Sequence, residues 1–231
     1  MSNDQPLQLW ATNAFQSVLK PLAAQVKEAA GEMSVAYRSS NMILAEAAKG
    51  GRGDALIATR QALERLARDG VVDAATITDL ASVGLGLGVR AGAPRPDVST
   101  PQSVRDVLLA ARSIVYSSTG ASASYFLDMV QRLGIAAEVR AKAIVYAGGL
   151  VGELVAQGEA EIGAQMVSEI LAVPGVELAG ELPPQFRNPT VFAGAVFAGA
   201  KQPVRARALI TLLASAAARD AFRAAGMAPP R

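Results

Sequence analysis

Residues 113–134, SIVYSSTGASASYFLDMVQRLG, run from a short apolar strand through a cluster of small hydroxyl residues into a helix. Residues 33–49, MSVAYRSSNMILAEAAK, repeat this pattern. The start of a helix carries unpaired backbone N–H groups and a partial positive charge, and small residues let an anionic group approach them. The two segments therefore predict two helix starts that bind an anion without a metal.

The alternation of strand and helix continues on both sides of these segments. It predicts an α/β fold with largely parallel sheets. Pro21 predicts a break in the first helix. Strands are predicted at residues 7–11, 33–37, 55–58, 83–89, 113–116, 143–145, 162–166 and 190–197. Helices are predicted at residues 15–30, 42–49, 61–69, 103–111, 122–133, 150–157, 204–214 and 216–225.

Two segments rich in Pro and Gly interrupt the alternation. Residues 91–101, AGAPRPDVSTP, are typical of a linker, and residues 174–189 form the second interruption. Two interruptions predict two lobes, one made of residues 1–83 and 195–231 and the other of residues 84–194. The glycines of residues 83–89, VGLGLGV, do not fit the G-x-G-x-x-G fingerprint, which excludes a Rossmann dinucleotide site there.

The composition excludes several kinds of chemistry. Of 231 residues, 51% are hydrophobic and 18% charged, which indicates a packed globular protein. The chain has no cysteine and no histidine, so disulfides, thiol nucleophiles and Ser-His-Asp triads are excluded. A net charge of +2 argues against a nucleic-acid groove, which needs clustered Lys and Arg. No cofactor or metal is predicted.

The compartment stays open at this point. No run is long and apolar enough for a membrane span, so no membrane insertion is expected. The chain opens MSNDQPLQLW, without the basic and apolar regions of an export leader. We expect a periplasmic protein if a leader was replaced by Met1, and a cytoplasmic one if Met1 is the native start.

Ligands of open α/β sheets bind beyond the carboxyl ends of the strands, where the following helices begin. Four such junctions are predicted, two in each lobe. The candidate anion-binding residues at these junctions are Thr12 and Asn13, then Arg38, Ser39 and Ser40, then Ser118 and Ser122, and finally Gly148.

Each candidate also has a purely structural explanation. Ser40 and Asn41 are good helix N-caps, which contribute about 1 kcal/mol without any ligand. Residues 117–119 are typical of a solvated turn, and residues 148–149 of a tight turn. Arg38 fits an ordinary surface charge, and Asp54 fits a residue that braces its own turn. What favours a binding site is that the pattern recurs after several strands.

Five stretches together resemble the type II periplasmic solute-binding proteins, in particular the molybdate-binding group of ABC transporters. The resemblance covers nearly the whole chain. It implies a two-lobed fold of mixed, mainly parallel sheets flanked by helices, with a ligand cleft between the lobes. It also implies a monomer with a transporter permease as partner. The stretches are LWATNAFQSVLKPLA at 9–23, YRSSNMILAEAAKGGRGDALIATRQALERLARDGVV at 37–72, VYSSTGASASYFLDMVQRLGI at 115–135, LVAQGEAEIGAQMVSEI at 154–170 and ARALITLLASAAARDAFRAAGM at 206–227.

By position, the resemblance implies that oxyanion-binding groups of that family fall on Ser40, Ser122 and the amide near Gly148, so that Ser40 and Ser122 face one ligand across the cleft. This chain departs from the family at Ala14, where the family has a serine, and at Met166, where it has a ligand-binding tyrosine. Arg38 adds a charge that a molybdate pocket does not need. A guanidinium offers a bidentate fork to a carboxylate, so we expect an organic acid rather than molybdate.

Two functions from different classes remain. The first is a binding protein that captures a small anion, an organic carboxylate or an oxyanion, for an ABC-type transporter. The second is an isomerase of an unsaturated tricarboxylic acid, similar to aconitate isomerase, that moves a proton on the same scaffold. Such chemistry needs one positioned base, and no spacing singles it out. The candidates are Tyr37, Glu46, Asp54, Tyr125 or a serine.

Overall fold

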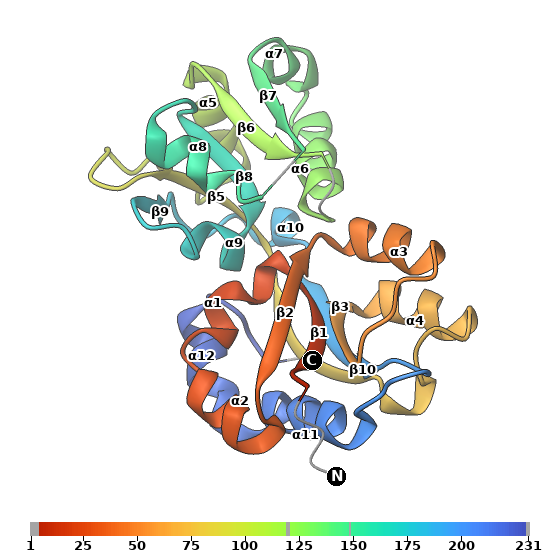
Figure 1. Cartoon of the computed structure of the whole chain (residues 1–231). Coiled ribbons are helices and arrows are strands. Elements are labelled where there is room, and N and C mark those ends of the chain that lie inside the picture. The colour runs from red at the N-terminus through yellow and green to blue at the C-terminus, as the bar shows by residue number, and fades with distance from the viewer. Residues whose placement is uncertain (1–4, 119–120, 148, 230–231) are drawn as a thin grey trace. The chain divides into compact units, whose positions relative to one another are not determined.

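The computed structural model describes residues 5–118, 121–147 and 149–229 (Figure 1). The chain divides into two compact units, each with its own five-stranded mixed sheet flanked by helices. Unit 1 consists of Met1–Ser82 and Thr190–Arg231, and unit 2 of Val83–Pro189. In the described parts of the chain, the helices are too short or too polar to cross a membrane.

The sheet of unit 1 has the strand order β2-β1-β3-β10-β4. Strand β1 pairs in parallel with β2 and β3, whereas β10 is antiparallel to β3. Its strands are β1 (Leu7–Thr12), β2 (Met33–Arg38), β3 (Ala55–Thr59), β4 (Thr78–Val83) and β10 (Thr190–Val196). Its helices are α1 (Gln16–Leu19), α2 (Ala23–Ala30), α3 (Ser40–Ala48), α4 (Arg60–Arg68), α11 (Pro203–Ala214) and α12 (Arg219–Ala224), with 3₁₀ helices at Asn13–Phe15, Ala74–Thr76 and Ala216–Ala218.

Helices cover both faces of this sheet (Figure 1). On the face under α3 and α4, Trp10 and Leu56 join a buried cluster with Ile43 and Leu63. On the opposite face, Gly194 of β10 lets Ile210 of α11 approach closely, since an added Cβ would lie 3.1 Å from that side chain. Alternate residues of each strand thus serve opposite layers, as the pleat requires.

Asp54 secures unit 1 at the amino end of β3. The side chain is buried, and its two oxygens accept hydrogen bonds from three backbone N–H groups. Oδ2 accepts from Gln8 at 2.9 Å, and Oδ1 from Lys201 at 2.8 Å and Gln202 at 2.9 Å. Asp54 therefore braces more than its own turn, because it joins β1 to the segment that leads into α11.

The sheet of unit 2 has the strand order β7-β6-β8-β5-β9. Strand β6 is parallel to β7 and β8, whereas β5 is antiparallel to β8 and β9. Its strands are β5 (Leu85–Arg90), β6 (Ile114–Ser117), β7 (Ala143–Tyr146), β8 (Ile162–Met166) and β9 (Val176–Leu178). Its helices are α5 (Pro101–Ala110), α6 (Ala121–Arg132), α7 (Ala136–Ala141), α8 (Gly152–Gln157), α9 (Val167–Leu171) and α10 (Pro184–Arg187).

The glycines of residues 83–89 have a packing role. A Cβ at Gly88 would lie 2.9 Å from Ile170 of α9, and one at Gly84 only 2.5 Å from the carbonyl oxygen of Arg187. Gly84 also separates two strands, β4 and β5, where the sequence analysis predicted a single strand. Gly88 thus lets α9 lie directly against the backbone of β5, and Gly84 lets the end of α10 lie against the backbone just before β5.

The prediction that residues 91–101 are a linker between lobes is wrong. This segment lies within unit 2 and connects β5 to α5. Its end starts the helix, because the Thr100 side chain accepts a hydrogen bond from the backbone N–H of Ser103 at 3.0 Å and Pro101 occupies the first helical position. Proline at a helix start and proline in a linker look the same in sequence.

Candidate functional site

The carboxyl edge of unit 1 is the edge of its sheet where β1, β2 and β3 end. Thr12 and Arg38 lie there at paired register positions of two neighbouring strands. Thr12 is only 3% exposed. Its hydroxyl and one guanidinium nitrogen of Arg38 are buried without a hydrogen-bond partner among the described residues. A buried polar group without a partner costs about 1–3 kcal/mol, so two such groups side by side indicate a binding site.

Trp10 holds the Arg38 guanidinium in place. The Cζ atom of Arg38 lies 5.0 Å from the centre of the Trp10 ring, a cation–π arrangement. Trp10 and Thr12 are two residues apart on β1, so both point to the face of the sheet covered by α3 and α4. The stacking fixes a partly buried positive charge beside the Thr12 hydroxyl, which is a suitable environment for a carboxylate.

The serines after β2 have separate roles. Ser39 is the N-cap of α3, and its hydroxyl accepts from the Met42 N–H at 3.2 Å. The predicted N-cap at Ser40 or Asn41 is therefore wrong by one or two residues. The Ser40 hydroxyl accepts from the Thr59 N–H at 3.4 Å, which ties α3 to the end of β3. It still has its own proton to donate to a ligand.

Asn13 begins the 3₁₀ helix that follows β1. Its Oδ1 accepts a hydrogen bond from Nε2 of Gln16 at 3.5 Å, and the side chain is half-buried. In unit 1 the structure therefore brings Thr12 and Arg38 together as neighbours, while Asn13 and Ser40 lie at the ends of the same group of strands.

The carboxyl edge of unit 2 is where β6, β7 and β8 end. Ser122, in the first turn of α6, is fully buried, and its hydroxyl has no hydrogen-bond partner within the described ranges. Ser118 is exposed, and its backbone N–H donates to the Tyr146 carbonyl at 2.9 Å. Gly148, also predicted to bind the ligand, lies outside the described residues. Ser122 thus parallels Thr12 as a buried hydroxyl after a strand.

Gln165 is a residue of this edge that the sequence analysis missed. It is buried in β8, where its Oε1 accepts from the Val151 N–H at 2.9 Å and its Nε2 donates to the Gly149 carbonyl at 3.5 Å. These bonds fix the segment between β7 and α8. A glutamine inside the otherwise apolar run Ile162–Met166 was the available signal, because a buried amide needs partners.

Glu169 is the second missed residue. It is buried in α9, and its Oε2 accepts from the Met166 N–H at 3.2 Å. Burial raises the pKa of this carboxyl to about 7, while the hydrogen bond from Met166 acts in the opposite direction. Near neutral pH this edge therefore contains a carboxyl group that readily gains or loses a proton.

The candidate bases named from the sequence are less well placed. Asp54 lies at the amino end of β3, away from the carboxyl edge, with its oxygens bound to three backbone N–H groups. Tyr37 is partly exposed, and burial raises the pKa of its phenol. Glu46 and Tyr125 are half-buried on α3 and α6. Their geometry does not single out any of them.

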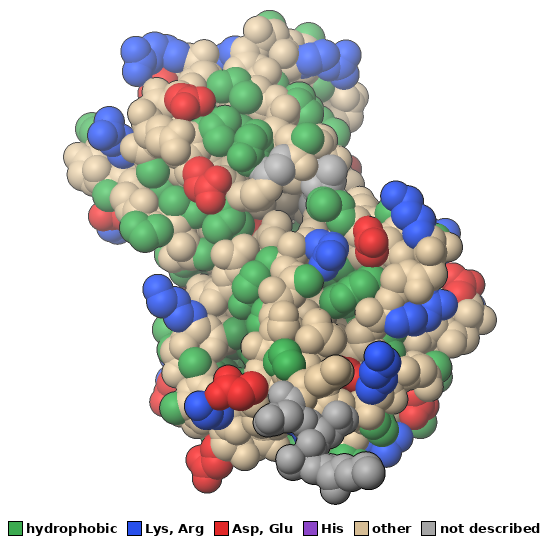
Figure 2. Space-filling model, viewed as in Figure 1, with side chains coloured by type: hydrophobic (Ala, Val, Ile, Leu, Met, Phe, Trp, Pro, Cys, Tyr) green, Lys and Arg blue, Asp and Glu red, His purple; other side chains and the backbone are tan. Residues whose placement is uncertain are grey.

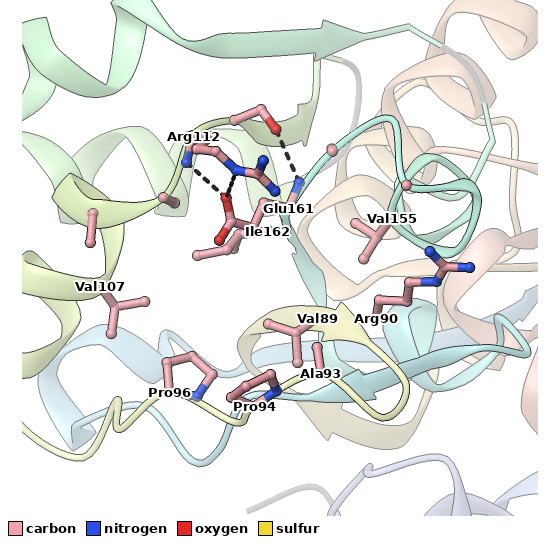
Figure 3. A pocket seen from close by; sticks show the side chains of 15 residues that line it. Val89, Arg90, Ala93, Pro94, Pro96, Val107, Arg112, Val155, Glu161 and Ile162 are labelled. Atoms are coloured by element: carbon pink, nitrogen blue, oxygen red, sulfur yellow. Dashed lines mark hydrogen bonds and ion pairs between the residues drawn. The ribbon is translucent and has the colours of Figure 1, made fainter.

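A cavity of about 690 Å³ also lies in unit 2, at the opposite edge of the sheet (Figure 3). Ser113 and Glu161, which precede β6 and β8, line it together with Pro94 and Pro96. The Arg112 side chain is paired with Glu161 at 3.2 Å. This cavity therefore contains none of the predicted anion-binding residues.

Solved structures define the class of the fold. The periplasmic molybdate-binding protein of Azotobacter vinelandii matches with a TM-score of 0.77 and 18% identity, over 97% of this chain and 100% of that chain. A Campylobacter jejuni protein solved with bound L-phospholactate gives a TM-score of 0.71 and 17% identity, with the same coverage of both chains. The fold is that of the type II periplasmic binding proteins, as the resemblance implied.

The sequence comparisons define the family. Residues 7–228 match the family described as bacterial extracellular solute-binding protein, and this chain belongs to it. An aconitate isomerase from Pseudomonas sp. is 33% identical over 176 residues, which are 76% of this chain and 67% of that relative.

Proposed function

We propose that this chain binds a small anionic solute through the carboxyl-edge residues of its units and delivers it to the permease of an ABC-type transporter. The observation that carries the proposal is the pair Thr12 and Arg38, two adjacent buried polar groups without a partner among the described residues. Membership of the solute-binding family supports it. We expect the protein to act as a monomer, with Ser40 and Ser122 binding the same ligand.

The residues favour an organic carboxylate as the ligand. A guanidinium binds the two oxygens of a carboxylate with two parallel N–H···O bonds, and Arg38 is held for this by Trp10. Ser122 offers a hydroxyl for a second anionic group. One similar protein is an aconitate isomerase, and another was solved with L-phospholactate bound. A di- or tricarboxylic acid has a second carboxylate that such a hydroxyl can bind.

A ligand screen tests this proposal. The unfolding temperature is measured with molybdate, sulfate, citrate and trans-aconitate, and affinities are then determined by isothermal titration calorimetry. A ligand present at 100 times its dissociation constant stabilises the folded chain by about 2.7 kcal/mol. We expect stabilisation by a carboxylate. Stabilisation by molybdate alone would contradict the assignment of Arg38, and no stabilisation by any of the four would contradict the proposed function.

Isomerisation of an unsaturated tricarboxylic acid is the second candidate function. The 33% identity to an aconitate isomerase favours it, and Glu169 supplies a carboxyl group able to accept and return a proton near neutral pH. Incubation of trans-aconitate with the protein in heavy water tests it by NMR. Incorporation of deuterium at carbon indicates proton transfer. Tight binding without deuterium incorporation leaves only the binding function.

A further inference from the structure

Glu169 lies at the carboxyl edge of unit 2, the edge that also holds Ser122. Its carboxylate holds the backbone N–H of Met166, the last residue of β8. Strands β6 and β8 are parallel neighbours with Tyr116 opposite Ala164, so both strands end at the same edge of the sheet. Glu169 lies in the helix that follows β8, and Ser122 lies in the helix that follows β6. Both residues therefore belong to the carboxyl edge of this sheet, where the parallel strands end.

Few charges surround Glu169. Helix α9 packs on β5, β8 and β9, and Glu169 is its only charged residue. Strand β8 has none, and Arg90 lies at the far end of β5 from Leu85, the partner of Met166. On β9, Glu177 is paired with Arg95 at 2.6 Å. Arg187 of α10, which also contacts β5, is paired with Glu181. Among the described residues of the elements packed against α9, no unpaired cation therefore faces the anionic form of Glu169.

A local structural role for Glu169 is also clear. It is the third residue of α9, and its carboxylate accepts a hydrogen bond from the backbone N–H of Met166, the residue that caps the helix start. A glutamine would make the same bond to the Met166 N–H through its amide oxygen. Capping therefore explains the position of the Glu169 side chain but does not require an acid. Glu169→Gln keeps the cap and removes the titratable group, so it separates a structural role from a role in proton uptake.

We propose that the acid form of Glu169 is the state of unit 2 that binds an anion, so that ligand binding takes up one proton at this side chain. The inference rests on the proposed function, because it adds a proton to the anion site assigned above. An anion held near Glu169 disfavours a second negative charge there. The bound state therefore retains the Glu169 proton to higher pH, and affinity falls as the pH rises.

Calorimetry on the wild-type chain and on Glu169→Gln tests the inference. Each anion of the screen that binds is titrated between pH 6 and pH 8.5, in two buffers with different ionisation enthalpies. If binding raises the carboxyl pKa by one unit, the wild type loses about sevenfold in affinity relative to Glu169→Gln over this range. It also takes up about half a proton per ligand at pH 7.5. The wild type and Glu169→Gln are titrated with the same ligand. Any protonation of the ligand itself therefore affects both proteins equally and cancels in the comparison.

Glu138→Gln, which removes an exposed carboxylate from α7 of the same unit, is the matched control and should follow the wild type. The same pH dependence in wild type and Glu169→Gln would overturn the inference and leave the proposed function intact. If the wild type binds none of the four anions, the proposed function fails and the inference with it. If Glu169→Gln does not fold, proton uptake by the wild type decides alone, and zero uptake overturns the inference.

Discussion

The carboxyl edges of the two sheets offer an anion different kinds of groups. In unit 1 the edge has a permanent cation, Arg38, stacked on Trp10 beside the buried Thr12 hydroxyl. In unit 2 the edge has a buried hydroxyl at Ser122, a segment fixed by Gln165 and a carboxyl group at Glu169. The first edge attracts a negative charge at any pH, whereas the second does so best while its acid is protonated.

The buried carboxylates differ between the units in the same way. Asp54 in unit 1 accepts three backbone N–H bonds, whereas the hydrogen bond found for the Glu169 carboxyl comes from one backbone N–H. Several donors stabilise a buried negative charge, and a single donor leaves burial dominant. The difference teaches that Asp54 serves the fold, while Glu169 remains free to exchange a proton. Figure 2 shows that charges of both signs are otherwise interspersed on the visible surface.

The largest expected effect comes from Asp54→Ala. The substitution leaves the N–H groups of Gln8, Lys201 and Gln202 without their acceptor, and bonds to a charged group contribute about 1.5–3 kcal/mol each. We expect the free energy of unfolding to fall by about 3–5 kcal/mol in urea titrations. Asp69→Ala, at an exposed position after α4, is the control. A loss below about 1 kcal/mol would show that Asp54 is not a structural brace.

The second largest effect is expected in the pH dependence of stability, which should differ between the wild type and Glu169→Gln. Its pKa is raised by burial from 4.5 to about 7, so the folded chain binds more protons than the unfolded chain between these values. The stability contributed by the acid form is complete below pH 4.5 and is lost as the pH rises to about 7. Between pH 5 and pH 8, the wild type should lose roughly 2–3 kcal/mol relative to Glu169→Gln. Parallel curves in urea titrations would contradict the raised pKa.

Strand–helix alternation was enough to predict most elements of the fold. The strand at Ile162–Met166 has the predicted bounds, and the break at Pro21 separates α1 from α2. The elements β4, α7, α9, β9 and α10 were missed. The last three span only three to five residues, too few for a periodicity to detect. Their positions depend on packing against β5, where Gly84 and Gly88 make room.

For the candidate site, the sequence singled out Thr12 and Ser122, whose hydroxyls are buried without a partner among the described residues. Sequence could not tell which hydroxyls cap helices and which stay without a partner, since that depends on a shift of one residue between Ser39 and Ser40. It also gave no means to find Glu169. The importance of that residue arises from burial and from the lack of nearby cations, which only the tertiary structure determines.

Removal of the fixed cation tests the contribution of unit 1 to binding. Arg38→Met should weaken a carboxylate ligand about 100-fold, since loss of a charged hydrogen-bonding partner costs about 2–5 kcal/mol. Arg38→Lys should recover part of the affinity, because it restores the charge without the planar fork. Calorimetry measures both, and Arg68→Met, at an exposed position on α4, is the control. Unchanged affinity in Arg38→Met would place the ligand away from this edge.

The smallest expected effect comes from removing each of the two buried hydroxyls, those of Thr12 and Ser122. Thr12→Val and Ser122→Ala each remove a hydroxyl that has no hydrogen-bond partner in the described structure while nearly preserving shape. A buried donor without a partner destabilises the fold, so both variants should match or exceed the wild type in urea titrations by up to about 1 kcal/mol. Both should nevertheless bind the ligand about tenfold more weakly, the value of one hydrogen bond to a charged group.

Ser124→Ala provides the control for Ser122→Ala, because the exposed Ser124 hydroxyl donates to the Ala121 carbonyl of its own helix at 2.9 Å. Removal of a ligand-binding hydroxyl should raise stability and lower affinity. Removal of a hydroxyl that stabilises the helix should lower both stability and affinity. If Thr12→Val loses affinity and Ser122→Ala does not, unit 1 alone holds the ligand. The pH dependence assigned to Glu169 should then be absent from binding, so this pair of variants also tests whether the second edge takes part at all.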